Sequence, residues 1–141
     1  MSTEQNKAAV RSFIERGINQ HNLDEFDVFY SPKVTDHALP PNMPSGLEGR
    51  KLFASAFFSA FPDIQVTIED LVAEGDRVAA RQSARGTHKG ELMGIPPTGK
   101  QVAITGMFVF RFENGKVVEH WEIFDQMGMM QQLGVIPAPG Q

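Results

Sequence analysis

Asp125 is the residue of this chain whose position best suits proton-transfer chemistry. The apolar alternation over Val117–Met127 predicts a strand, and period two places Asp125 on the same face as Trp121 and Ile123. A carboxylate on an apolar face is costly to bury unless it is paired or used, and burial raises its pKa. The pattern therefore makes Asp125 the candidate acid-base group, with a strand-end aspartate that caps a loop or pairs with Arg81 as the alternative.

The register around Asp125 follows from the turn that precedes its strand. Val102–Phe112 is joined to it through Glu113-Asn-Gly-Lys116, and Asn-Gly is a strong hairpin signal because both turn positions need positive φ. A regular ladder then pairs Phe112 with Val117, Phe110 with Glu119, Phe108 with Trp121, Gly106 with Ile123 and Ile104 with Asp125. We expect this face to be interior, and the face that carries His120, Glu122 and Phe124 to meet solvent or a partner subunit.

Arg81 is the second candidate catalytic group. A tight turn at Glu74-Gly-Asp-Arg77 pairs Asp70 with Arg81, and the same ladder puts both on the apolar face of Val66, Ile68 and Val72. Two interpretations stay open: a structural cross-strand ion pair, or a guanidinium whose remaining donors stabilise a developing enolate oxygen.

The four histidines have separate expectations. His37 follows a short strand and is a candidate second acid-base group, with a solvent-facing histidine as the alternative. His88 lies in a Gly-Thr-His connection, where it bonds loop backbone or contacts substrate. His120 is assigned to the outer sheet face, and His21 to a helix end. None has metal-ligand spacing and the chain has no cysteine, so we predict no metal and no cofactor.

Length and composition restrict the class of protein. The 141 residues suit one domain, and 41% hydrophobic with 21% charged residues is ordinary for a globular protein. A net charge of −4 without a basic stripe argues against nucleic acid, and no apolar run is long enough for a membrane span. A cytoplasmic protein is expected. Eleven phenylalanines and seven methionines suggest a pliable apolar interior that accepts a small apolar molecule.

The elements that must position these residues fall into two groups. Helices are predicted from Ser2 to about His21, from Asn22 to the Ser31-Pro32 break, and over Gly49–Phe61, with a short strand at Lys33–His37. Four long antiparallel strands follow from Ile64 onward. This order predicts an α+β fold in which a curved antiparallel sheet packs on about three N-terminal helices and leaves a cone-shaped interior. Residues 1–141 form one domain, with a mobile tail at 134–141.

With that layout, the chain resembles the SnoaL-like polyketide cyclase, or ester cyclase, group of the nuclear-transport-factor-2-like superfamily, over nearly its whole length. The motifs that carry the resemblance are Phe61-Pro-Asp63, Glu74-Gly-Asp76, Gly86-Thr-His88, Gly94-Ile-Pro-Pro-Thr-Gly-Lys100, Phe110-Arg-Phe112, Gly115-Lys116, Glu119-His-Trp121, Asp125 and Gln132-Leu-Gly-Val135. The resemblance implies a cone-shaped α+β barrel, a homodimer through the outer sheet face, and an apolar pocket with an acid-base aspartate that matches Asp125.

Two related branches imply other reactions. Limonene epoxide hydrolases use an arginine between two aspartates, and their Arg-x-Asp strand is similar to Arg81-Gln-Ser83, where Ser83 replaces the second acid. Epoxide opening would then need Asp70 to supply the missing carboxylate. Ketosteroid isomerases use tyrosine and a protonated acid, and the one tyrosine here is Tyr30.

The leading hypothesis is a cofactor-independent cyclase or isomerase that acts on an apolar carbonyl or ester substrate of the polyketide kind. Asp125 is its acid-base group, with Arg81 or His37 to stabilise or shuttle charge. The residues expected to contact the substrate are Trp121, Phe108, Ile123, Ile104, Asp70 and His88. The alternatives are a non-catalytic module that binds a small apolar ligand or forms a dimer, and an epoxide hydrolase-like enzyme.

Overall fold

The helices of the chain precede its long strands, apart from one short helix at the end. The computed structural model describes residues 2–137 and 140. Its N-terminal half holds α1 (Thr3–Ser12), the π-helical segment η1 (Phe13–Asn19), α2 (Asp24–Phe29), β1 (Tyr30–Asp36) and α3 (Gly46–Ala60). The strands β2 (Gln65–Glu74), β3 (Arg77–Thr87), β4 (Gln101–Glu113) and β5 (Lys116–Phe124) follow, and α4 (Gln126–Leu133) ends the described elements.

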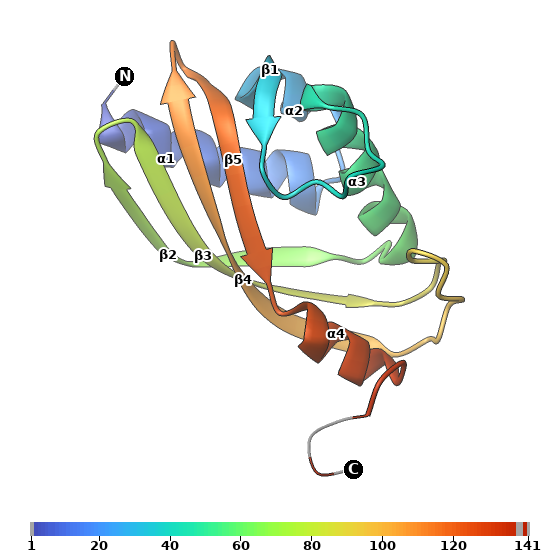
Figure 1. Ribbon diagram of the computed structural model, residues 1–141. Coiled ribbons are helices and arrows are strands. Elements are labelled where there is room, and N and C mark those ends of the chain that lie inside the picture. Colours follow the sequence, from blue (N-terminus) through green and yellow to red (C-terminus); the bar gives the residue numbers. More distant parts are fainter. Residues whose placement is uncertain (1, 138–139, 141) are drawn as a thin grey trace.

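The strands form one curved sheet in the order β1-β5-β4-β3-β2. β1 runs parallel to β5, and the other neighbours are antiparallel. The helices α1, α2 and α3 cover one side of this sheet, while α4 lies beyond the end of β5 (Figure 1). The predicted α+β fold, a curved sheet on N-terminal helices, is confirmed.

The core lies between the helices and the concave side of the sheet. Ser2 caps α1 with a capping box, and Val10 and Phe13 of this first helical stretch are buried. Phe13 stacks on Phe29 with ring centroids 4.2 Å apart, and Phe29 meets Phe110 of β4 edge to face. The phenylalanine-rich interior predicted for β4 is therefore present.

Both predicted hairpin turns are present, but each hairpin also contains a β-bulge that the sequence pattern did not reveal. Asn114 and Gly115 have φ values of 50° and 79°, as a two-residue turn of this kind requires. Phe112 pairs with Val117 as predicted, but Arg111 then pairs with Glu119, so Val118 is an extra residue. An extra residue shifts the phase of the strand by one and exchanges its two faces.

The consequence is a correction for β5. His120 lies opposite Phe110, and Glu122 lies opposite Phe108, so His120 and Glu122 face the interior. Trp121 and Ile123 face outward. The predicted pairs of Phe108 with Trp121 and of Ile104 with Asp125 are wrong for this reason.

A second bulge has the same effect in β2. Asp70 pairs with Arg81 as predicted, but Ile68 pairs with Gln82 because Glu69 is an extra residue. Val72 is consequently 65% exposed on the outer face, where Asp70 and Arg81 also lie.

The C-terminal end of β5 also differs from the prediction. The strand ends at Phe124 rather than Met127, and Asp125 becomes the N-cap of α4. Gly134 closes this helix with a φ of 80°. The mobile tail at 134–141 stays a prediction, and its residues 138, 139 and 141 lie outside the described part of the chain. Among the described residues, no helix combines the length and apolar character that crossing a bilayer demands.

Candidate functional site

Five polar side chains meet at the concave side of the sheet, and β5 supplies two of them. The bulge at Val118 turns His120 and Glu122 toward the helices, where His120 is only 2% exposed. Phe108 and Phe110 of β4 pack beside the His120 ring, with centroids 5.8 and 5.3 Å away. The two polar groups of β5 are thus held against an aromatic wall.

Arg50 reaches the same point from α3. It lies on the inward stripe of that helix, because Leu47, Ala54 and Phe57 are three, four and seven residues away and face the core or the cavity. The Arg50 residue is 5% exposed. A buried guanidinium requires carboxylate partners, and two of them are present.

β1 provides the remaining members, Tyr30 at its start and Asp36 at its end. Tyr30 is 1% exposed and packs edge to face on Phe13. Asp36 accepts a hydrogen bond from the Ala38 backbone N–H at 2.9 Å, and its other oxygen pairs with Arg50 Nη1 at 3.2 Å. Because β1 runs beside β5, Tyr30 and Asp36 bracket His120.

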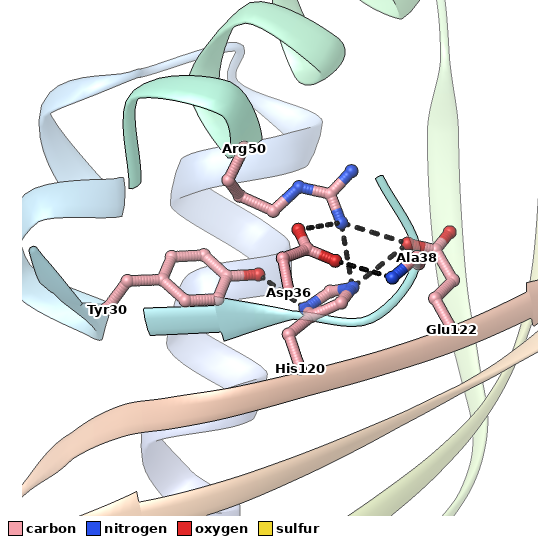
Figure 2. Close-up of polar contacts among 6 residues, drawn as sticks. All are labelled: Tyr30, Asp36, Ala38, Arg50, His120 and Glu122. Carbon is pink, nitrogen blue, oxygen red and sulfur yellow. Dashed lines mark hydrogen bonds and ion pairs between the residues drawn. The ribbon is translucent and has the colours of Figure 1, made fainter. Parts of the chain in front are cut away.

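The contacts form one connected cluster of Tyr30, Asp36, Arg50, His120 and Glu122, called the polar cluster below (Figure 2). Tyr30 Oη lies 3.0 Å from His120 Nδ1. His120 Nε2 lies 3.1 Å from Glu122 Oε1 and 2.7 Å from Arg50 Nη1. Arg50 Nη1 also donates to Glu122 Oε1 at 3.2 Å.

The tautomer of His120 decides which of these contacts are hydrogen bonds. With the proton on Nε2, His120 donates to Glu122 and accepts from the Tyr30 hydroxyl. With the proton on Nδ1, it accepts from Arg50 and donates to the Tyr30 oxygen. The ring therefore links a phenol and a carboxylate by a proton that has two positions.

Burial and charge set the ionisation of the cluster. Burial and the positive charge of Arg50 lower the pKa of His120, so its ring is neutral at neutral pH. Burial acts to raise the pKa of Glu122, but the hydrogen bond from His120 and the charge of Arg50 outweigh it, so that pKa lies below its usual value. Burial also raises the pKa of Tyr30 far above that of a free phenol. The cluster thus offers an ionised carboxylate beside the neutral His120 and Tyr30 and the positively charged Arg50.

A cavity of about 110 Å³ opens onto four members of the cluster, Tyr30, Arg50, His120 and Glu122. Its other walls are mainly apolar and come from the helices and the sheet: Phe13, Ile18, Phe26, Phe53, Ala54, Phe57, Phe58, Ile64, Val66, Ala84, Ile104, Phe108 and Phe124. Gln82 is the one further polar side chain among the described residues that line it. An engineered apolar cavity of about 150 Å³ accepts benzene, so this space suits roughly one aromatic ring.

Asp125 is not part of this cavity. It is exposed, and its Oδ1 accepts a hydrogen bond from the Gly128 backbone N–H at 2.9 Å as the N-cap of α4. The expectation that Asp125 faces an apolar interior is wrong, because the bulge inverts β5 and the strand ends at Phe124, just before Asp125. Glu122 is the β5 carboxylate that lies inside.

Arg81 and its partner Asp70 also lie elsewhere. They form an ion pair of 2.6 Å on the outer face, with side chains 50% and 61% exposed. The structural interpretation of this pair is the one that the geometry supports. Its predicted place on the apolar face is wrong because of the bulge at Glu69.

Three other predicted site residues form an outer-face group. The His37 ring stacks on Trp121 with centroids 4.9 Å apart, and His37 Nε2 lies 2.9 Å from Glu119 Oε2. The Arg77 guanidinium also lies over the Trp121 ring, 5.1 Å from its centroid. Ile123 is 75% exposed. None of these residues is among the described residues that line the cavity.

Phe108 and Ile104 do line the cavity, as the sequence predicted for the inner face of β4. His88 is fully buried, but it packs against Phe61, and its Nδ1 accepts a hydrogen bond from the Thr98 backbone N–H at 3.2 Å. It therefore holds the 88–98 connection and does not line the cavity.

Sequence reasoning missed the five members of the polar cluster as a site. One signal was available for Arg50, because Leu47, Ala54, Phe57 and Phe61 define a helical stripe in which a charged residue must be paired. Among the described residues, no group of three or more His, Asp or Glu side chains is arranged to hold a metal ion. In the polar cluster the Arg50 guanidinium already stands between the two carboxylates.

Comparisons with known proteins show which family the chain matches. Residues 8–133 match the family model of the SnoaL-like polyketide cyclases. The aklanonic acid methyl ester cyclase AcmA of Streptomyces galilaeus is 30% identical over 137 residues, which cover 90% of this chain and 89% of that protein. The nogalonic acid methyl ester cyclase of Streptomyces nogalater is 28% identical over 121 residues, with 82% and 88% coverage.

A solved structure gives the same result for the fold. AclR of Streptomyces galilaeus, described as a candidate hydroxylase, superposes with a TM-score of 0.86 at 32% identity. The superposition covers 99% of this chain and 87% of AclR.

Proposed function

The chain belongs to the SnoaL-like polyketide cyclase family, and we propose that it is a cofactor-independent cyclase whose acid-base group is Glu122. The single observation that carries this proposal is the polar cluster at the wall of an apolar cavity, where one ionised carboxylate lies beside Arg50, His120 and Tyr30. The methyl ester cyclases among the relatives support a carbonyl or ester substrate.

The first step is abstraction of a proton from the carbon next to an ester carbonyl. That proton passes to Glu122, and the electron pair of the C–H bond moves onto the carbonyl oxygen to give an enolate. Arg50 Nη1, together with the Tyr30–His120 pair, supplies the donors that stabilise the enolate oxygen. Donors fixed in a water-poor cavity act more strongly than the same groups in water.

The second step closes a ring. The enolate carbon attacks a ketone carbon of the same molecule, a C–C bond forms, and the resulting alkoxide takes the proton back from Glu122. Atoms and charge balance without a further reactant, so the product has the mass of the substrate. The lowered pKa of Glu122 keeps its base form fully populated at neutral pH.

A keto ester whose body is a single aromatic ring, the size that the cavity admits, tests the proposal in D2O. We expect the protein to exchange the hydrogen next to the ester carbonyl for deuterium and, in ordinary water, to give a ring-closed product of unchanged mass. Glu122→Gln should slow both processes by about 10² to 10⁴-fold, the usual contribution of a positioned general base. Mass spectrometry and NMR of the substrate carbon give the two readouts.

Asp125→Asn is the matched control, because asparagine also caps helices and Asp125 is the aspartate that the family resemblance indicated. We expect this variant to keep the parent rate. Loss of exchange in Asp125→Asn but not in Glu122→Gln would overturn the assignment of the base. Binding of the ester without exchange would favour the non-catalytic alternative, and a product heavier by one oxygen would contradict cyclisation.

A homodimer through the outer sheet face and a cytoplasmic location stay predictions. The outer face carries the Arg77–Trp121–His37 stack and exposed apolar side chains, which supports the dimer.

A further inference from the structure

Gln82 is a polar side chain in an otherwise apolar part of the cavity. Its cross-strand neighbours are Ile68 on β2 and Gly106 on β4, and Phe124 follows on β5. The residue is 4% exposed and lines the cavity. No charged group of the polar cluster is paired with it, so the amide needs another explanation.

The amide oxygen of Gln82 lacks a hydrogen-bond donor. Within residues 2–137 and 140, no N–H or O–H reaches Gln82 Oε1, although this atom is fully buried. An apolar side chain of the same length would avoid that cost, because a buried amide without partners is disfavoured. A partner that enters the cavity would remove the cost.

Gly106 provides the space that the amide occupies. A Cβ atom at Gly106 would lie 2.7 Å from Gln82 Nε2, 2.8 Å from the Ile123 carbonyl oxygen and 3.0 Å from Phe124 Cβ. Backbone and side chain both crowd this position, so only glycine leaves the Gln82 amide where it is. The absence of a side chain at Gly106 of β4 thus leaves room for the Gln82 amide.

We propose that Gln82 determines substrate specificity by binding a hydroxyl group on the apolar ring of the ligand. This inference rests on the proposed function only in taking the cavity as the substrate site. A hydroxyl both donates and accepts, so it pairs with the amide in either orientation of the amide group. The surrounding phenylalanine and aliphatic side chains suit a ring that carries this hydroxyl.

The bound hydroxyl orients the ring and takes no part in the chemistry. Gln82 lies two strands and two residues from Glu122 along the sheet, which separates their Cα atoms by roughly 12 Å. A hydroxyl at Gln82 therefore lies away from the carbon that loses its proton at Glu122. The ligand class is a phenol or other ring alcohol whose reacting carbonyl lies on its far side.

Two probes of the same shape test this inference without any turnover. p-Cresol and p-xylene differ in one hydroxyl and one methyl, and calorimetric titration gives the Kd of each. We expect the ratio of the p-xylene Kd to the p-cresol Kd to fall about tenfold on Gln82→Met, as loss of one hydrogen bond to a buried group implies. In the parent protein, p-cresol but not p-xylene should shift the Gln82 side-chain amide resonance.

The control is Gln126→Met, which changes an exposed glutamine at the start of α4 and should leave the ratio unchanged. An unchanged ratio in Gln82→Met, or no binding of either probe by the parent protein, would overturn the inference. Glu122→Gln should keep the parent ratio. If that variant keeps the ratio and also turns over substrate normally, the proposed function falls while the role of Gln82 stands.

Discussion

At the scale of single residues, the polar cluster places more carboxylates than positive charges in the interior. Arg50 carries one positive charge, and Asp36 and Glu122 are the two carboxylates that pair with it at 3.2 Å. Taking such groups out of water is costly, and a buried ion pair often contributes little net stability. The cluster is therefore better explained by what it offers a ligand in the cavity than by a gain in stability.

His120 makes the stability of this protein depend on pH. Its pKa is lowered in the folded state by burial and by Arg50, so the unfolded chain binds a proton more readily than the folded one. The contribution of His120 to the free energy of unfolding is therefore fully present above the ordinary histidine pKa of about 6.5. It falls as the pH drops below that value, and in total it amounts to about 1.4 kcal/mol for each unit by which folding lowers the pKa. Urea unfolding at about pH 7.5, 6.5 and 5.5 measures how the free energy of unfolding changes with pH.

His120→Gln isolates the contribution of that one ring. We expect the variant to be less stable than the parent protein at pH 7.5 and to lose less stability between pH 6.5 and 5.5, because its amide does not titrate there. The other histidines are common to both proteins. Equal slopes for both proteins would contradict a lowered pKa at His120.

At the scale of elements, the sequence predicted the turns, the strand order within each hairpin and the aromatic face of β4. Asn114-Gly115 fixed one turn through its positive φ angles, and Phe108 and Phe110 lie inside as their alternation indicated. The comparisons confirm the family and its cyclase-type enzyme class. Local pattern and turn chemistry were sufficient for these predictions.

The same pattern could not predict the site, because β2 and β5 each contain a bulge. Val117 and Val118 are adjacent apolar residues in β5, as Leu71 and Val72 are in β2, so either phase of each strand is compatible with an apolar inner face. Because of this one-residue shift, the interior acid of β5 is Glu122 and not the predicted Asp125. The contacts between β1, α3 and β5 join residues that are far apart in sequence, and periodicity within one element cannot predict such contacts.

Deletion of single residues from β5 tests the role of the bulge. Removing Val118 leaves a regular ladder in which His120 still faces Phe110, so we expect a folded protein that keeps exchange activity with a modestly lower Tm. Removing Trp121 keeps the bulge but turns Glu122 outward, and exchange should be lost. Circular dichroism melts and the deuterium assay measure both. Equal activity in the two variants would contradict the assigned register.

At the scale of the whole molecule, the outer sheet face carries exposed apolar side chains that suit the predicted dimer. Met107 lies directly opposite Ile123 in the β4–β5 ladder, and these side chains are 39% and 75% exposed. Arg81 is the next residue across the sheet from Met107, and it is already paired with Asp70. An apolar centre with paired charges at its edge is typical of an interface between two copies related by a twofold axis.

Ile123→Asp tests whether this face joins two copies of the chain. We expect the parent protein to show about twice the 15.6 kDa mass of one chain in light scattering, and the variant to show one, because two facing carboxylates would be buried without partners. The one tryptophan, Trp121, belongs to the same face, so its emission should shift to the red in the variant. Val28→Asp alters a side chain that is 66% exposed on α2, away from the sheet, and should leave the mass of the dimer unchanged. A parent protein that scatters as a single chain would show that the apolar outer face has another role, whereas the cavity, on the opposite side of the sheet, should bind p-cresol equally well in either state.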